Sequence, residues 1–127
     1  MATWHKISRD SLRTARHLLE TRDEAFARSS ISRSYYAAYS AITGALPRGI
    51  GFSQGRNNPS HFQVARFVKY NLFLSGMAVR RRVLGDIRFL WQARLAADYR
   101  PGQSIPRDLA LHCFHRALYI LRQTGVL

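Results

Sequence analysis

The chain has 127 residues, of which 20 are lysine or arginine and 7 are aspartate or glutamate, so its formal net charge is +13 at neutral pH. This length suits a single domain over residues 1–127, and 46% hydrophobic residues with 21% charged residues argue against intrinsic disorder. The single cysteine excludes an internal disulfide framework and a four-thiolate zinc site, and no apolar run is long enough to span a membrane. We therefore expect a cytoplasmic protein with one hydrophobic core and no bound cofactor.

Five segments of the chain place apolar residues three or four positions apart, which is the spacing of an amphipathic helix. They run from about residue 8 to 21, 23 to 46, 58 to 76, 78 to 99 and 107 to 125. A loop rich in glycine and proline separates the second segment from the third, and Arg100-Pro101-Gly102 ends the fourth. No stretch alternates apolar and polar residues as a strand would. The sequence therefore predicts an all-α fold, an antiparallel up-and-down bundle of four longer helices with a fifth short or split element.

Basic residues cover one face of the first predicted helix. They are spaced at intervals of three, four and three residues: Lys6, Arg9, Arg13 and Arg16. The apolar stripe of the same helix, which contains Leu12, Ala15 and Leu19, falls on a different face. We therefore predict a purely cationic ridge on the surface of the bundle.

A second basic cluster, Arg80-Arg81-Arg82, begins the fourth predicted helix. The helix dipole disfavours cations at this end, so a bound anion would stabilise the arrangement. His61 begins the third predicted helix, where backbone N–H groups can hold an anion; the alternative is a capping or solvent-facing histidine. These residues are therefore candidate contacts to phosphate.

The surplus of basic residues predicts a partner with many negative charges. Eighteen of the twenty basic residues are arginines, whose planar guanidinium groups pair well with phosphate. We expect RNA or another nucleotide-bearing polyanion as the partner. The alternatives are an acidic protein docked on the same basic faces, and a charge that merely reflects arginine-rich codon usage. Membrane association is not predicted, because the first helix lacks the broad aromatic face that binding to a membrane surface needs.

Three runs of sequence carry a family resemblance. They are Arg33-Ser34-Tyr35-Tyr36-Ala37-Ala38-Tyr39, Ser60-His61-Phe62-Gln63-Val64 and Arg94-Leu95-Ala96-Ala97-Asp98-Tyr99, followed by an amphipathic closing helix. In this order and spacing, the chain resembles the HEPN superfamily of small helical proteins from about residue 8 to 123. The resemblance implies a helical bundle that forms homodimers and is often encoded beside a small nucleotidyltransferase, its antitoxin partner in toxin–antitoxin pairs. It also implies a possible activity as a metal-independent ribonuclease, since several members cleave RNA with an Arg-x(4–6)-His motif shared across the dimer.

The chain contains two literal matches to that motif, Arg56 to His61 and Arg107 to His112. A histidine suits the proton transfers of RNA cleavage because its pKa lies near neutrality, and an arginine stabilises charge on the phosphate. Arg107 and His112 open the last helix, but five residues turn a helix by about 500°, so the two face apart unless Arg107 lies in an unwound start or a second protomer takes part.

By its position, the run from Arg94 to Tyr99 takes the place of the family motif. It keeps the arginine and the aromatic residue but has Asp98 where a histidine would act, and an ionised aspartate repels phosphate. The alternative interpretation is a simple ion pair, because Arg94 and Asp98 are four residues apart on a helix. The candidate catalytic residues are therefore Arg107, His112, Arg94, Asp98 and Tyr99.

Other chemistry-bearing residues have simpler explanations. Tyr35, Tyr36 and Tyr39 could stack on bases, but their helical spacing favours a place in the core, with one left at a groove or dimer seam. Cys113 falls in the apolar part of the last helix and is expected in the core. His112 and His115 lie one turn apart but have too few neighbouring ligands, so no metal site is predicted.

Overall fold

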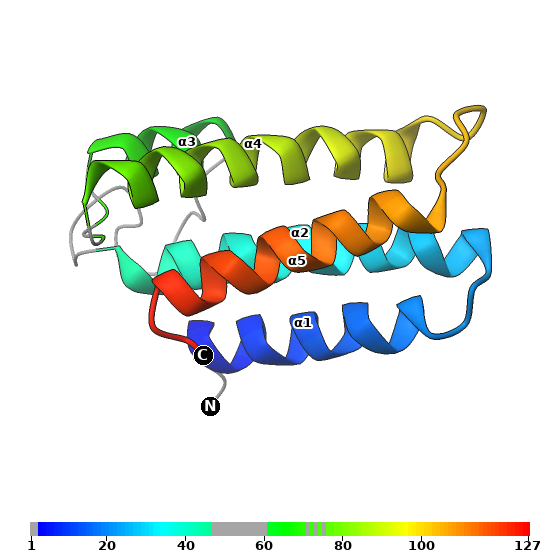
Figure 1. Cartoon of the computed structure of the whole chain (residues 1–127), viewed down its shortest axis with the longest axis horizontal. Helices are drawn as coiled ribbons and strands as arrows, with labels where there is room; N and C mark the ends of the chain where they lie inside the picture. Colours follow the sequence, from blue (N-terminus) through cyan, green and yellow to red (C-terminus); the bar gives the residue numbers. More distant parts are fainter. Residues whose placement is uncertain (1–2, 47–60, 71, 73, 75) are drawn as a thin grey trace.

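The computed structural model describes residues 3–46, 61–70, 72, 74 and 76–127, with His61 and Phe62 described by their backbone alone. Five helices form in these ranges: α1 (Trp4–Leu19), α2 (Glu24–Ala45), α3 (His61–Tyr70), α4 (Met77–Tyr99) and α5 (Arg107–Gln123). Figure 1 shows α1, α2, α4 and α5 as long helices that alternate in direction, with the short α3 beside α4. The described residues contain no strand. The predicted all-α, up-and-down bundle is therefore confirmed.

Side-chain caps determine where the first two helices begin. The Thr3 hydroxyl accepts a hydrogen bond from the backbone N–H of Lys6 at 3.1 Å, so α1 begins at Trp4, four residues before the predicted start. The Asp23 carboxylate accepts from the backbone N–H of Ala25 at 2.9 Å, so α2 begins where its sequence predicts. The remaining ends of α1, α2, α4 and α5 lie within two residues of the predicted ones.

Helix α2 is the centre of the bundle, because it packs against each of the other four helices. Small residues allow α1 to come close to it: the Ser8 hydroxyl donates to the backbone carbonyl of Ala37 at 3.0 Å, and both residues are completely buried. A Cβ atom added at Gly44 would lie only 2.8 Å from the Cβ of Trp4. The backbones of α1 and α4 do not approach each other within the described ranges, so a strip of α2 between them stays open.

Aliphatic side chains from all five helices fill one continuous core. The largest completely buried members include Ile31, Ile42, Ile87, Leu90, Ile120 and Leu121. Cys113 is completely buried among them, as predicted, and burial raises the pKa of its thiol to about 12. Each helix keeps polar residues on its outer side, and none of the described helices is long and apolar enough to cross a membrane.

Helix α3 is shorter than predicted. It ends at Tyr70 instead of running to residue 76, and the backbone N–H of Leu72 donates back to the carbonyl of Phe67 at 3.0 Å. The Arg80 guanidinium closes this end, because it donates to the carbonyls of Lys69 at 2.9 Å and Leu72 at 2.6 Å. A guanidinium from α4 therefore occupies carbonyls at this end of α3, where the apolar spacing of the sequence continues. The predicted start at Asn58 lies outside the described residues.

Candidate functional site

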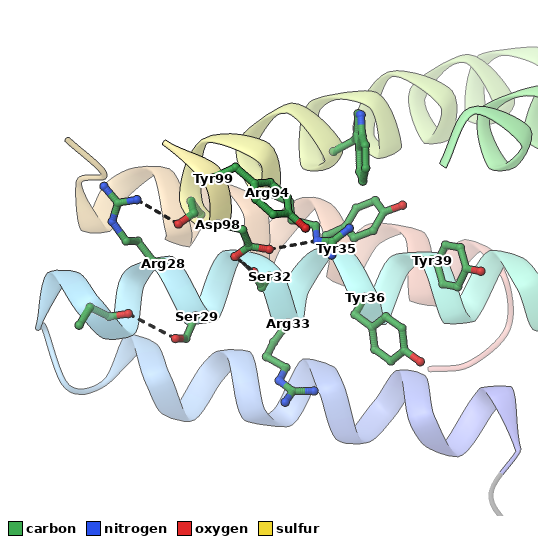
Figure 2. A pocket seen from close by; sticks show the side chains of 13 residues that line it. Arg28, Ser29, Ser32, Arg33, Tyr35, Tyr36, Tyr39, Arg94, Asp98 and Tyr99 are labelled. Carbon is green, nitrogen blue, oxygen red and sulfur yellow. Dashed lines mark hydrogen bonds and ion pairs between the residues drawn. The ribbon is translucent and has the colours of Figure 1, made fainter. Parts of the chain in front are cut away.

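A groove of about 1060 Å³ lies between α2 and the C-terminal half of α4 (Figure 2). Its walls carry three arginines, Arg28, Arg33 and Arg94, and five aromatic rings, Tyr35, Tyr36, Tyr39, Trp91 and Tyr99. Helical spacing explains this lining, since residues three and four apart repeat along one face of each helix. The groove therefore combines cations and aromatic rings from two helices in one concave site.

Arg28 forms the end of the groove and has a structural role. Its guanidinium donates to Ala97 at 3.0 Å and to four more backbone carbonyls at the end of α4 and in the following turn: Ala96, Arg100, Pro101 and Gln103. These bonds tie the end of α4 and the following turn to α2, in addition to the backbone N–H groups that already donate to Ala96 and Arg100. The role of Arg28 could not be predicted from the sequence, because no local pattern links residue 28 to acceptors about seventy positions away.

Arg94 and Asp98 form the ion pair that their spacing allows. Arg94 Nε donates to Asp98 Oδ2 at 3.2 Å, and the Ser32 hydroxyl donates to Asp98 Oδ1. The Arg94 guanidinium carbon also lies 5.3 Å from the ring centre of Tyr35 and 5.4 Å from that of Trp91, within range of a cation–π contact. The ion pair itself is therefore confirmed, and both carboxylate oxygens of Asp98 already have partners.

The tyrosines of α2 divide between the core and the groove. Tyr35 and Tyr39 are buried, whereas Tyr36 is 38% exposed and stacks on Tyr39 with ring centres 5.9 Å apart. The prediction that most of them lie in the core with one left at a groove is therefore confirmed. Burial raises the pKa of Tyr35, and burial together with the nearby Tyr36 raises that of Tyr39 to about 12, so neither phenol loses its proton near neutral pH. Tyr99 of α4 is 64% exposed, which makes it the most open ring of this lining.

Arg33 is the groove arginine that remains available to a ligand. Its side chain is exposed, and it makes no hydrogen bond or ion pair with another described residue. Figure 2 shows it pointing toward the α1 side of the groove, away from Asp98. Arg33 belongs to a run that carries the family resemblance, but no pattern in the sequence marks it as a binding residue.

The structure does not bring the catalytic candidates together in one protomer. Arg94, Asp98 and Tyr99 share the groove, but neither Arg107 nor His112 lines it. Arg107 instead donates from Nε to the carbonyl of Leu19 at 2.9 Å and borders a separate cavity of about 180 Å³. His112 lies exposed on α5. Within the described ranges, no cluster of three histidine, cysteine or acidic side chains could hold a metal ion.

The α1 ridge is less positive than predicted. Asp10 lies within it, where its carboxylate pairs with Lys6 Nζ at 2.6 Å and approaches Arg13 at 3.9 Å. The prediction of a purely cationic ridge is therefore wrong, because Asp10 is four residues from Lys6 and three from Arg13 on the same helix. Arg9 and Arg16 are exposed and have no ion pair with a described residue.

The cluster at the start of α4 is largely engaged within the protein. Arg80 caps α3, and the Arg82 guanidinium lies 3.7 Å from the ring centre of Tyr119 and 3.8 Å from the buried carboxylate of Asp86. Arg81 is exposed and unpaired among the described residues. Two of the three arginines thus have partners without any bound anion. The side chain of the remaining candidate, His61, lies outside the described part of the chain.

Comparison with known proteins gives no match: no family model, no curated protein and no solved structure is similar to this chain. The resemblance to the HEPN superfamily therefore stays a prediction, and the chemistry of the groove has to support any functional conclusion.

Proposed function

We propose that this protein binds RNA through the groove between α2 and α4. The observation that supports this most directly is the combination of an unpaired cation, Arg33, with the exposed rings of Tyr36 and Tyr99 in one concave site. Aromatic rings stack on bases with about 1–3 kcal/mol per base, and guanidinium groups pair with phosphate oxygens. Both halves of a nucleotide therefore find a complementary group in the groove.

The net charge of +13 contributes attraction over a longer range. Exposed arginines such as Arg9, Arg16 and Arg81 lie outside the groove and raise the local concentration of a polyanion without choosing where it binds. We therefore expect the arginines outside the groove to speed association and the groove to hold the RNA strand. The resemblance to HEPN proteins supports the same partner, and with it a homodimer and a nucleotidyltransferase-type antitoxin.

Binding is a better supported function of the groove than cleavage. The described residues that line it include no histidine, Asp98 is held by Arg94 and Ser32, and the pKa values of Tyr35 and Tyr39 are raised. A proton carrier active near neutral pH is thus missing from this set of residues. Ribonuclease activity would require a group such as His112 to reach the groove from a second protomer.

Fluorescence anisotropy with a short, unstructured, labelled RNA tests the proposal. We expect binding that weakens as salt rises from about 50 to about 200 mM, and a clear loss of affinity in Arg33→Gln. Arg81→Gln is the matched control, because it removes an equally exposed and unpaired arginine outside the groove. The proposal fails if the wild-type protein does not bind at low salt, or if the two variants lose the same affinity.

A gel assay of the same RNA in EDTA tests cleavage separately. Cleavage that disappears in His112→Ala would support a ribonuclease whose histidine comes from α5. Retained binding without cleavage would leave RNA binding as the function.

An acidic protein partner is the second candidate. Tyrosine, tryptophan and arginine are the residues most enriched at the energetic centres of protein interfaces, and the groove is lined by four tyrosines, three arginines and Trp91. Polyglutamate is a suitable probe. If it displaces RNA as well as unlabelled RNA of equal charge does, an acidic protein is the favoured partner. If it displaces RNA only weakly, the groove recognises bases.

A further inference from the structure

The groove holds two arginines whose surroundings differ, and we infer from this that they recognise different parts of a single-stranded RNA. Arg33 binds a backbone phosphate, whereas Arg94 presents its flat face to a base. The inference rests on the proposed function and adds the strand type and the role of each arginine to it.

The charge of Arg94 is compensated within the protein. Its Nε lies 3.2 Å from Asp98 Oδ2, and Asp98 is held in place by the hydroxyl of Ser32. A guanidinium paired in this way is part of a neutral unit, so it neither attracts a phosphate strongly nor releases a counterion when RNA binds. A phosphate that approached Arg94 would also be repelled by the Asp98 carboxylate.

Arg94 carries a flat guanidinium group that is held near two aromatic rings. Its guanidinium carbon is 5.3 Å from the ring centre of Tyr35 and 5.4 Å from that of Trp91, and its side chain is 31% exposed. Contact with the two rings and the bond to Asp98 restrain the orientation of the guanidinium plane. Guanidinium planes are established stacking platforms for unpaired bases. Arg94 therefore extends the aromatic surface of the groove toward the exposed ring of Tyr99.

Arg33 has the opposite surroundings. It follows Ser32 directly in α2, but its side chain is exposed and has no partner among the described residues. Its charge is therefore uncompensated, and a phosphate that it binds releases about 0.7 counterions from a single strand. Figure 2 shows Arg33 on the α1 side and Arg94 on the α4 side, so the backbone of the strand lies toward α1 and its bases toward α4.

This arrangement selects a single strand. In a duplex the faces of the bases are stacked on one another, and a side chain can reach only their edges and the backbone. The rings and the guanidinium plane of the groove require accessible base faces. Single-stranded RNA therefore fits the groove, and duplex RNA is left with the phosphate contact alone.

The salt dependence of RNA affinity separates the two roles. We expect Arg33→Gln to reduce the slope of log K against log salt by about 0.7, and Arg33→Lys to keep that slope because the charge is retained. The double variant Arg94→Gln/Asp98→Asn removes the ion pair as a neutral unit, so it should leave the slope unchanged and weaken binding about tenfold. Arg94→Lys keeps the charge but should weaken binding as much, since an ammonium group has no stacking plane.

Two further measurements guard against a merely structural effect. An abasic RNA strand carries phosphates but no bases, so Arg33→Gln should weaken its binding and Arg94→Gln/Asp98→Asn should not. Asp98→Asn leaves the charge of Arg94 uncompensated, so the slope of log K against log salt should become steeper by about 0.7.

The inference is overturned if Arg94→Gln/Asp98→Asn lowers the salt slope as much as Arg33→Gln does, or weakens the binding of abasic RNA equally. Duplex RNA that competes as well as the single strand would also contradict it. These results would leave RNA binding itself intact, whereas a wild-type protein that binds no RNA overturns both the inference and the proposed function.

Discussion

The α1 ridge and the α2–α4 groove both carry arginines, yet they differ in every feature that makes a binding site. The ridge lies on a single convex helix, and Asp10 neutralises part of its charge. The groove draws Arg33, Tyr36 and Tyr99 from two helices into one concave surface. Charge density along the sequence therefore indicates what kind of partner is attracted, while concavity and aromatic rings decide where that partner is held.

The largest effect is expected for Arg28, which keeps the end of α4 against α2 and so maintains the groove. Arg28→Ala removes one donor group from five backbone carbonyls and should lower the free energy of unfolding by about 2–4 kcal/mol. Urea denaturation measures the difference.

Arg33→Ala is the control for that experiment, since it removes an exposed arginine of the same helix and should change stability by less than about 0.5 kcal/mol. Equal transition midpoints for the two variants would show that the Arg28 contacts contribute nothing.

The next effect concerns how closely α1 packs on α2. In Gly44→Ala the new methyl group would lie 2.8 Å from the Cβ of Trp4, so the two helices must separate, at a cost of about 1–3 kcal/mol. Gly85→Ala is the matched substitution in α4, where a Cβ meets nothing within 4 Å. It should stabilise the protein by up to about 1 kcal/mol through helix propensity. Thermal melts that shift in the same direction for both variants would contradict this explanation.

RNA affinity compares the two regions directly. Tyr99→Ala removes an exposed stacking ring and should weaken binding by about 1–2 kcal/mol at any salt concentration. The ridge variant Arg9→Gln/Arg16→Gln should have a smaller effect that vanishes as salt rises, because it removes only long-range attraction. If the ridge variant were the more damaging one at about 200 mM salt, the ridge and not the groove would hold the strand.

The smallest effects are two opposite pH dependences. Burial raises the pKa of Asp86, against the lowering effects of Arg116 at 2.9 Å and of Arg82. A raised pKa means that protonated Asp86 stabilises the folded protein. This contribution is complete at pH values below the pKa of Asp86 in the unfolded chain, and it is lost as the pH rises through the pKa of Asp86 in the folded protein. Hydrogen bonding to Lys6 lowers the pKa of the exposed Asp10, so its contribution is present at higher pH and is lost as the pH falls through its folded pKa.

Urea denaturation across the acid range separates the two aspartates. The free energy of unfolding of the wild-type protein, measured relative to that of Asp86→Asn, should fall as the pH rises. Measured relative to that of Asp10→Asn, it should increase over the same pH range. Parallel curves for the wild type and either variant would mean that the aspartate in question has the same pKa in the folded and unfolded chain.

Features that depend on nearby residues could be predicted from the sequence. The Arg94–Asp98 ion pair, the start of α2 near Asp23 and the burial of Cys113 all follow from residues that are close in the sequence. The predictions failed where a partner arrives from elsewhere: Arg80 of α4 donates to the carbonyls of Lys69 and Leu72, where α3 was predicted to continue, and Arg28 is engaged by a turn about seventy residues away.

The sequence by itself determined five amphipathic helices and a strongly basic surface, because helical periodicity and side-chain charge are local properties. Only the tertiary structure decided which arginines remain available to a ligand. Periodicity shows that one face of a helix is buried, but not which helix covers it or which side chain reaches its terminal carbonyls. The groove lies where α1 and α4 both pack on α2 without their backbones approaching each other within the described ranges, and that arrangement comes from the packing of the whole bundle.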